Sequence, residues 1–424
     1  MAVIKPFKGV IYNSKLIEEL GKVITPPYDV IDAAGQDKLH AACPYNVIRL
    51  EYGKTSPEDT ERDNRYTRAE AVLNQWFKDQ ILVIDEPAAF YLYEQHYTYN
   101  RNSYRRRGIF TALKVDHYQN KTVLPHELTM SAPKADRLEL LKRLQTNISP
   151  IFTLYPDPED RIAAYFAQAT REKPLFEAEE ETGQVHKVWK LTDLKIQQDL
   201  SHYLHDQPFL IADGHHRYET ALKYSATSAS RTGDGKDYIM TVMVSMKDPG
   251  LLILPTHRLI TGLDSNQEIQ LQKLLEKYFS YEKFGDPGRM DCNRYLDRLA
   301  ELNRTNGAIG IIDADQAGFI SLDLSGDSEA LPVEILQDQI LKPLLAPGEQ
   351  SIVDQKMLSY PHDIDSAMQA VLSGQARVAF ILEPIAVEAV LKRAEAGRVM
   401  PQKSTFFYPK LPSGLVMHHH RLSY

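Results

Sequence analysis

The chain has 424 residues, of which 43% are hydrophobic and 25% charged, and its formal net charge is −8 at pH 7. This composition is normal for a globular protein and leaves room for two or three domains, or for one large interwoven one. The acidic balance argues against general affinity for nucleic acid or for anionic membranes.

The two cysteines, Cys43 and Cys292, make neither a disulfide framework nor a metal cluster, which favours a reducing setting. The N-terminus lacks the apolar core of a signal peptide, and no apolar run approaches the length that spans a bilayer. We therefore expect a cytoplasmic protein without membrane or nucleic-acid partners. The histidine run at 418–420 resembles a fragment of a purification tag, but Arg421 follows it, and we assign it no function.

The first part of the chain is predicted to hold strands, turns and one helix. Two prolines fix residues 25–30 as a rigid loop that projects Asp29, either as a turn cap or as a substrate contact. Residues 45–53 alternate in polarity as a strand does, and residues 56–78 carry apolar side chains at helical spacing.

Residues 88–99 and 103–115 form a predicted β-hairpin around a polar turn. The basic run 105–107 is interpreted as a solvated strand edge, with contact to an anionic ligand as the alternative. Pro125 keeps the following loop extended, and Glu127 in that loop is either a general base or a capping or salt-bridge residue. A helix is expected from about 134 to 147.

The rest of the chain alternates helices and strands, which indicates a mixed α/β fold (α+β mixed). Strands are expected at 151–155, 185–195, 238–246, 251–258, 308–312, 318–324 and 376–382, and helices at 161–170, 197–204, 267–279, 294–303, 332–345, 364–373 and 386–395. The strand that closes at 261–262 predicts two closely packed regions, 1–262 and 263–424.

The run from Phe209 to Leu222 is the most informative stretch of the sequence. It opens as an apolar strand and ends as the first turn of a helix, with an acid, a glycine, two histidines and an arginine between. Helix N-termini attract anions, because their backbone N–H groups are unpaired and carry partial positive charge. Gly214 lets the backbone approach a ligand, and Arg217 can bind a phosphate through two parallel hydrogen bonds. Asp213 can hold a divalent metal or take a proton.

The same residues also fit a plainer structure, in which Asp213 is an N-cap and His215, His216 and Arg217 form a solvated helical turn. We favour a phosphate or metal site, because ionisable side chains are so dense there. Adjacent histidines point apart on a helix, so a zinc site is not expected. The sequence has neither a P-loop nor a Gly-x-Gly-x-x-Gly motif, and any nucleotide chemistry must therefore use another architecture.

Five motifs resemble those of a large bacterial and archaeal family catalogued as a domain of unknown function. They are Pro-Pro-Tyr-Asp-Val at 26–30, Pro-His-Glu at 125–127, Ala-Asp-Gly-His-His-Arg-Tyr-Glu-Thr at 212–220, Pro-Thr-His-Arg at 255–258 and Met-Pro-Gln-Lys-Ser-Thr-Phe-Phe-Tyr-Pro-Lys at 400–410. This resemblance covers the whole chain.

Residues 124–222 also resemble the ParB/sulfiredoxin superfamily, most of all its free-serine kinases. The resemblance implies a ParB/sulfiredoxin-like core within 1–262 and a C-terminal α/β region packed on that core. From Glu127 to Asp213 is 86 positions (213 − 127), more than in compact members of the superfamily, which implies an insertion around 156–205.

The resemblance also implies roles for the motif residues. Glu127 would deprotonate the serine hydroxyl, and Asp213 would assist through Mg²⁺ or through the hydroxyl. The phosphates would be bound by Gly214, His215, His216 and Arg217. A small amino acid also needs a carboxylate clamp and an ammonium partner, and the predicted substrate contacts are Asp29, His126, Arg258 and Lys403.

We therefore expect a kinase that transfers phosphate from ATP or ADP to free L-serine or a similar small hydroxyl compound, with Mg²⁺ as cofactor and with a homodimer as an open assembly state. The alternatives are a ParB-like switch that binds and hydrolyses nucleotide, and a non-catalytic metabolite-binding protein. A sulfiredoxin-like repair enzyme ranks last, because it needs a reactive cysteine where His215 stands.

Overall fold

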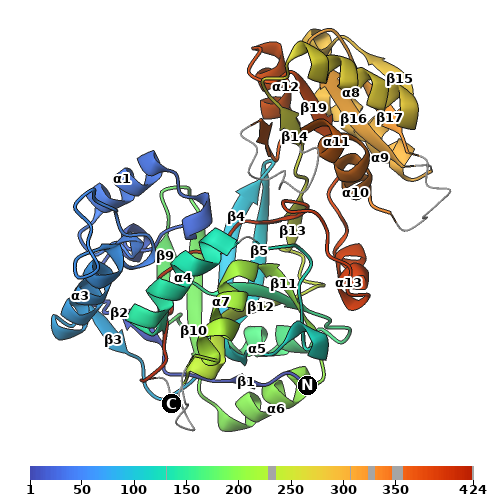
Figure 1. Ribbon diagram of the computed structural model, residues 1–424. Helices are drawn as coiled ribbons and strands as arrows, with labels where there is room; N and C mark the ends of the chain where they lie inside the picture. The colour runs from blue at the N-terminus through green and yellow to red at the C-terminus, as the bar shows by residue number, and fades with distance from the viewer. Residues whose placement is uncertain (130, 228–234, 306, 323–329, 346–356, 423–424) are drawn as a thin grey trace. The chain divides into compact units, whose positions relative to one another are not determined.

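The computed structural model describes residues 1–129, 131–227, 235–305, 307–322, 330–345 and 357–422. They fall into two compact units (Figure 1): unit 1 is formed by 1–252, 394–397 and 409–424, and unit 2 by 253–393 and 398–408. This division differs from the predicted regions 1–262 and 263–424, because the chain leaves unit 1 at Leu252 and its last segment returns there. None of the described helices is long and apolar enough to cross a membrane.

Unit 1 mixes strands and helices along its whole length. Its strands are β1 (Ile4–Lys5), β2 (Val10–Tyr12), β3 (Leu82–Ile84), β4 (Phe90–Tyr99), β5 (Asn102–Lys114), β6 (Val123–Leu124), β7 (Thr146–Asn147), β8 (Ile151–Tyr155), β9 (Phe176–Glu179), β10 (Val185–Leu191), β11 (Phe209–Asp213), β12 (Tyr238–Ser245) and β21 (His418–His419). Its helices are α1 (Ala33–Ala42), α2 (Ile48–Glu51), α3 (Arg65–Lys78), α4 (Ser131–Leu144), α5 (Arg161–Ala169), α6 (Leu194–His205) and α7 (His215–Ser225).

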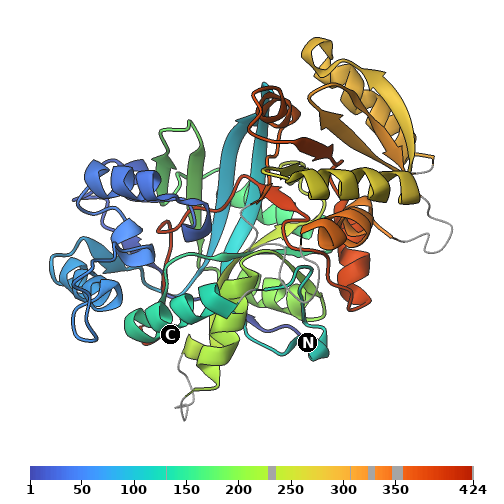
Figure 2. The ribbon, with the colours of Figure 1, turned by 45° about the horizontal axis from the view of Figure 1, so that its top comes forward.

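The described strands of unit 1 include a nine-stranded mixed sheet in the order β6-β11-β8-β12-β5-β4-β10-β9, with β1 paired to β5. The pairs β6–β11 and β8–β12 are parallel, and the other described pairs in the sheet are antiparallel. Helices α4 and α7 lie side by side along the sheet in both ribbon views (Figures 1 and 2). The mixed α/β class predicted from the sequence is therefore confirmed.

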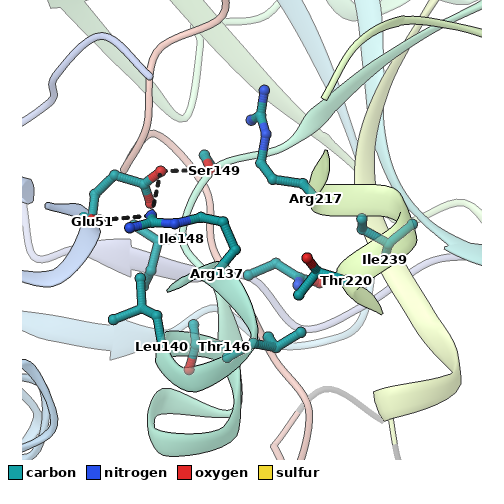
Figure 3. Close-up of a pocket in the computed structure, with 11 residues that line it drawn as sticks. Glu51, Arg137, Leu140, Thr146, Ile148, Ser149, Arg217, Thr220 and Ile239 are labelled. Atoms are coloured by element: carbon teal, nitrogen blue, oxygen red, sulfur yellow. Dashed lines mark hydrogen bonds and ion pairs between the residues drawn. The ribbon is translucent and has the colours of Figure 1, made fainter. Parts of the chain in front are cut away.

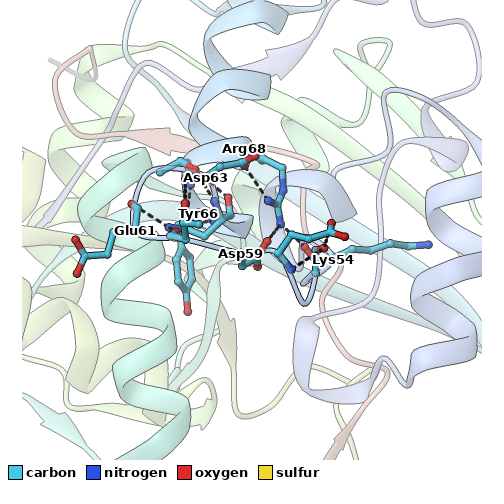
Figure 4. A network of polar contacts seen from close by, with 11 residues as sticks. Lys54, Asp59, Glu61, Asp63, Tyr66 and Arg68 are labelled. Atoms are coloured by element: carbon cyan, nitrogen blue, oxygen red, sulfur yellow. Dashed lines mark hydrogen bonds and ion pairs between the residues drawn. The ribbon is translucent and has the colours of Figure 1, made fainter.

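Local sequence explains where α3 begins. Asn64 is its N-cap and forms a capping box with Thr67, and the apolar face of the helix buries Leu73 and Trp76. Arg68 on the first turns reaches back to Asp59 and Asp63 in the preceding loop, as Figure 4 shows. The helix therefore begins at Arg65 and not at residue 56 as predicted, because the residues before Asn64 form the loop that Arg68 contacts.

Two sequence-based interpretations in unit 1 are wrong. Residues 45–53 do not form a strand: they contain α2, whose four residues bury Ile48, Leu50 and Glu51. The interpretation of the basic run 105–107 as a solvated edge fails at Arg106, although the Arg105 side chain is 57% exposed. Arg106 is only 1% exposed.

Unit 2 is built around a second sheet. The strands from the unit boundary onward are β13 (Leu252–Leu254), β14 (Arg258–Ile260), β15 (Ser280–Gly285), β16 (Ala308–Asp313), β17 (Ala317–Ser321), β18 (Leu358–Ser359), β19 (Val378–Ile381) and β20 (Phe406–Tyr408). The helices are α8 (Ser265–Tyr278), α9 (Cys292–Asn303), α10 (Pro332–Leu336), α11 (Lys342–Leu345), α12 (Ile364–Leu372) and α13 (Val387–Glu395), with a π-helical stretch, Gln337–Leu341, between α10 and α11.

Six of the described strands form a sheet in the order β15-β17-β16-β19-β14-β18, in which neighbouring strands are antiparallel, and β13 pairs with β20. Apolar clusters cover this sheet, one around Leu336 and Phe380 and another around Tyr295 and Phe319. The predicted strand 318–324 corresponds to β17, and its last two positions lie outside the described residues.

Candidate functional site

The two motifs that the sequence singled out lie next to each other in unit 1. Strand β6 runs parallel to β11, with Val123 opposite Phe209 and Leu124 opposite Leu210. Parallel strands end at the same edge of a sheet, so the loop after β6 and the turn after β11 emerge together. The parallel pairing thus brings Glu127 and the 213–217 turn to one place.

Two buried histidines join the loop to the turn. The backbone N–H of His126 donates to Nε2 of His215 at 3.2 Å, and the two rings meet edge to face at 4.6 Å. Nδ1 of His126 lies 2.6 Å from the carbonyl oxygen of Ile211, which can only accept, so this nitrogen carries the proton. Burial lowers the pKa of His126 and, further, that of His215, so both rings are neutral near pH 7.

Asp213 is held between two cations. Its Oδ2 accepts from the Arg217 guanidinium at 2.6 Å, and its Oδ1 accepts from Nζ of Lys410. Burial alone would raise the pKa of Asp213, but Lys410 and Arg217 beside it hold that pKa well below its usual value. We call Asp213, Gly214, His215, His216, Arg217 and Lys410 the charged turn.

Gly214 gives the charged turn its shape. Its φ of +97° lies in the region that L side chains rarely adopt, and a Cβ at this position would come within 2.8 Å of Cγ2 of Ile151. The following helix, α7, starts at His215 without a side-chain cap on its N-terminal N–H groups. The backbone conformation and the contact with Ile151 thus favour glycine at position 214, and the approach of a ligand to this backbone stays a prediction.

The other predicted residues of unit 1 surround this turn. The Glu127 side chain is 18% exposed, with Oε1 at 3.8 Å from Nε2 of His126. His216 is half-buried, and burial lowers its pKa against the opposing effects of Glu219 and Asp29. Asp29 is exposed, and its carboxylate is among the groups that raise the pKa of Arg217 against the effect of burial.

A small hollow of about 50 Å³ lies beside the charged turn (Figure 3), lined by both charged and apolar side chains. Arg217 borders it from α7, while Arg137 of α4 lies on the other side against Glu51 of α2. The hydroxyl of Ser149 donates to Oε1 of Glu51 at 3.0 Å, and the Arg137 guanidinium also stacks on the ring of Tyr28 at 4.1 Å. The volume suffices for water or for one small polar group.

Two predicted substrate residues, Arg258 and Lys403, belong to unit 2. Arg258 is 1% exposed and donates to the carbonyl oxygens of Thr256 at 2.5 Å and Lys403 at 3.1 Å. Its guanidinium lies over the ring of Tyr360 at 4.9 Å. Lys403 is exposed and has a φ of +60°. Arg258 thus has a structural task within unit 2, and the clamp role of both residues stays a prediction.

Two cations of the site region, Lys410 and Arg106, are not among the predicted site residues. Lys410 ends the motif at 400–410, in which Lys403 is the predicted substrate contact. Arg106 donates to the side-chain oxygen of Gln95 and, at 2.6 Å, to the carbonyl oxygen of Pro409, so β5 holds the segment that carries Lys410. The sequence offers one signal for Lys410: this lysine ends a motif that contains no acidic residue to pair with it.

The geometry does not favour Asp213 as a resident Mg²⁺ ligand. Both of its oxygens already accept from cations. Among the described residues, no group of three or more histidine, cysteine, aspartate or glutamate side chains could hold a metal ion. A Mg²⁺ ion at this turn would therefore need most of its ligands from phosphate and water.

Fold and site together define a mixed α/β protein with a cationic strand-to-helix turn. Residues 4–329 match the family model described as "Protein of unknown function (DUF1015)", and the chain belongs to this family. No curated relative matches the chain.

Several solved structures are similar to part of this chain. A conserved hypothetical protein from Pyrococcus furiosus is 14% identical with a TM-score of 0.39, and the match covers 74% of this chain and 97% of that one. A free serine kinase in complex with AMP is 14% identical with a TM-score of 0.41, covering 74% and 93%. SbnI with a C-terminal truncation, from Staphylococcus aureus, is 10% identical with a TM-score of 0.38, covering 72% and 87%. Similarity at this level does not establish a shared activity.

Proposed function

We propose that this protein is a small-molecule kinase that transfers phosphate from ATP or ADP to free L-serine or a similar small hydroxyl compound. The observation that carries the proposal is the charged turn, where Arg217, Lys410 and the N-terminus of α7 gather positive charge beside the loop of Glu127. Phosphoryl transfer depends on positioning and charge neutralisation more than on covalent chemistry. A cationic helix start next to a carboxylate supplies both requirements.

In this proposal the N-terminal N–H groups of α7, with Arg217, Lys410 and His216, bind the phosphates. Asp213 is a positioning residue, because it holds the two cations at the turn. His215 positions the loop through its contact with the His126 backbone. Mg²⁺ belongs to the nucleotide phosphates and supplies further charge neutralisation when it is bound.

The reaction step uses Glu127 as the general base. Its carboxylate takes the proton of the acceptor hydroxyl as that oxygen attacks the terminal phosphorus of the nucleotide. The bond between this phosphorus and its bridging oxygen breaks, and the nucleotide leaves with one phosphate fewer. His126 and Asp29 are the proposed acceptor contacts from unit 1, and Arg258 and Lys403 stay candidates for the carboxylate clamp. The ParB/sulfiredoxin-like description of the core belongs to the same proposal.

Phosphorus NMR tests the activity directly. The full chain is incubated with Mg²⁺, L-serine, and ATP or ADP, and the expected result is a new phosphomonoester signal that depends on serine. Glu127→Gln should lower the rate by about 100-fold or more, the range for a general base, with nucleotide affinity kept. Glu139→Gln, an exposed change on α4, is the matched control and should leave the rate unchanged.

Three results would count against parts of this proposal. Nucleotide hydrolysis without a serine product would favour the nucleotide switch instead. Thermal protection by nucleotide without any turnover would favour a metabolite-binding protein. Full turnover in Glu127→Gln would remove Glu127 from the mechanism.

A further inference from the structure

Unit 2 contains a hollow of about 280 Å³ at one end of its sheet, formed entirely by residues of this unit. Thr256 precedes β14, Gly307 precedes β16, and Leu382 follows β19. Because β19 runs antiparallel to both β14 and β16, these three chain positions meet at the same edge. The starts of α10 and α13 complete the wall.

A half-buried carboxyl group lies in this wall. Burial raises the pKa of Glu383, although a hydrogen bond from Asn303 and the charge of Arg304 oppose the rise. The Asn303 side-chain oxygen accepts from the backbone N–H of Ala308 at 2.7 Å, which turns the NH₂ group of the amide toward the carboxyl. Within the described parts of the chain, Glu383 forms no ion pair with a lysine, arginine or histidine. Its negative charge is thus only partly compensated.

A second polar group of the wall has unused hydrogen-bonding capacity. Thr256 is 2% exposed, and its hydroxyl has no hydrogen-bond partner among the residues that the structure describes. A buried hydroxyl without a partner costs roughly 1–3 kcal/mol. Thr256 is one of the residues that line the hollow, so its hydroxyl is a candidate hydrogen-bond partner for a ligand there.

Much of the remaining wall is apolar, although Thr305 and Ser404 also line it. Leu331, Val333 and Ile385 line it, so a ligand meets aliphatic surface opposite the carboxyl. Arg393 of α13 pairs with Glu334 of α10 at 2.9 Å, with side-chain exposures of 9% and 19%, which ties the two flanking helices together. The hollow is therefore a built feature of unit 2.

We propose that this hollow binds a small aliphatic ammonium compound. The ammonium group lies against the Glu383 carboxylate, Thr256 provides a hydrogen bond, and the aliphatic part packs on the apolar wall. Ligand pockets commonly span roughly 300–1,000 Å³, so this hollow takes a compound with only a few carbon atoms. Such a group is found in simple amines and in free amino acids. The proposal uses no residue of the charged turn and stands apart from the kinase proposal.

Isothermal titration calorimetry on the full chain tests the binding, with isobutylamine and L-valine as probes. At least one of them should bind saturably, and which one binds identifies the source: L-valine alone points to amino acids, isobutylamine to simple amines. Isobutyramide has a similar shape without the positive charge and should bind at least 10-fold more weakly. Glu383→Gln should weaken binding at least 10-fold, whereas Glu388→Gln, an exposed change at the start of α13, should not.

A second variant guards against misfolding of Glu383→Gln. Ala389→Leu adds volume at a wall position and should abolish binding in a chain whose melting curve is unchanged. The proposal is overturned if neither probe binds saturably, if isobutyramide binds as tightly as the amine, or if a folded Glu383→Gln or Ala389→Leu variant binds as the natural chain does.

Discussion

Buried charge at single positions is what gives the charged turn its electrostatic character. Asp213 is stable as an anion only because Lys410 and Arg217 lie beside it, since burial by itself opposes ionisation. Removing one cation therefore leaves the carboxylate partly uncompensated in a place that water reaches poorly. The effect should be much larger than that of a surface ion pair.

Lys410→Met tests this point. We expect the free energy of unfolding of unit 1 to fall by about 3 kcal/mol, the lower end of the range for breaking a buried pair, because Arg217 remains. Urea unfolding followed by tryptophan fluorescence measures it, since both tryptophans of the chain, Trp76 and Trp189, belong to unit 1.

Two further variants control this measurement. Lys142→Met removes an exposed pair with Glu139 and should change the free energy by about 0–1 kcal/mol. The double variant Lys410→Met with Asp213→Asn should recover part of the loss, because the stranded charge is gone. Equal losses in Lys410→Met and Lys142→Met would contradict a buried, charge-dependent role.

The C-terminal histidines make unit 1 sensitive to acid. Burial lowers the pKa of His420 to about 3, so the folded state keeps this ring neutral while the unfolded state takes a proton below about pH 6.5. The unfolded state thus binds more protons between these values, and stability falls as the pH falls through them, by up to about 1.4 kcal/mol per pH unit. The free energy of unfolding, measured by fluorescence at several pH values, should depend less on pH in His420→Gln than in the natural chain. His202→Gln changes an exposed ring on α6 and should leave this pH dependence unchanged.

Residue-scale features divide into those that local sequence reveals and those that it hides. The 213–217 turn was predictable, because acid, glycine, histidines and arginine lie within five positions. Lys410 was not, since its partner Asp213 is 197 positions away. The burial of Arg106 is hidden as well, because its side chain contacts the Phe152 ring and donates to the carbonyl oxygen of Pro409, both far away in the sequence.

At the scale of elements, the turn between β11 and α7 is held by one glycine. Gly214→Ala should destabilise unit 1, because alanine tolerates a φ of +97° poorly and its Cβ would press on Ile151. Gly183→Ala is the matched control, since Gly183 has a φ of +79° with nothing within 4 Å of the added carbon. We expect about 1–2 kcal/mol for the control and about 1–3 kcal/mol more for Gly214→Ala, measured by urea unfolding. Equal losses would mean that close packing at Gly214 does not matter.

A helix or strand is predictable where its segment is long enough to show the hydrophobic period of that element. The β4–β5 hairpin and α7 follow their patterns, and the structure contains both. The sequence pattern does not reveal helix α2, because a four-residue helix is too short to show a helical period. Its burial depends on partners elsewhere, such as Arg137, which donates to the carbonyl oxygen of Glu51 at 2.8 Å. Short elements that tertiary contacts stabilise are thus the ones that sequence patterns miss.

On the scale of the whole molecule, the largest difference from the prediction is the path of the chain after residue 262, which is predicted to form one C-terminal region. Residues 409–424 belong to unit 1, although unit 2 comes before them. There β21 pairs with β7, and Val416 and Met417 are fully buried. No local pattern marks such a return, because its partners lie hundreds of positions upstream.

Truncation tests whether unit 1 depends on this segment. A chain that ends at Tyr408 loses Lys410, β21 and several buried apolar side chains, and each large one contributes about 1.5–3 kcal/mol through burial. Their sum exceeds the stability reserve of most domains, so we expect unit 1 to lose cooperative unfolding and its native tryptophan emission. A chain that ends at Arg421 keeps these contacts and should unfold as the natural chain does. If the chain ending at Tyr408 kept a cooperative transition at the urea midpoint of the natural chain, residues 409–424 would not contribute to the stability of unit 1. Lys410 could then not be part of its folding core.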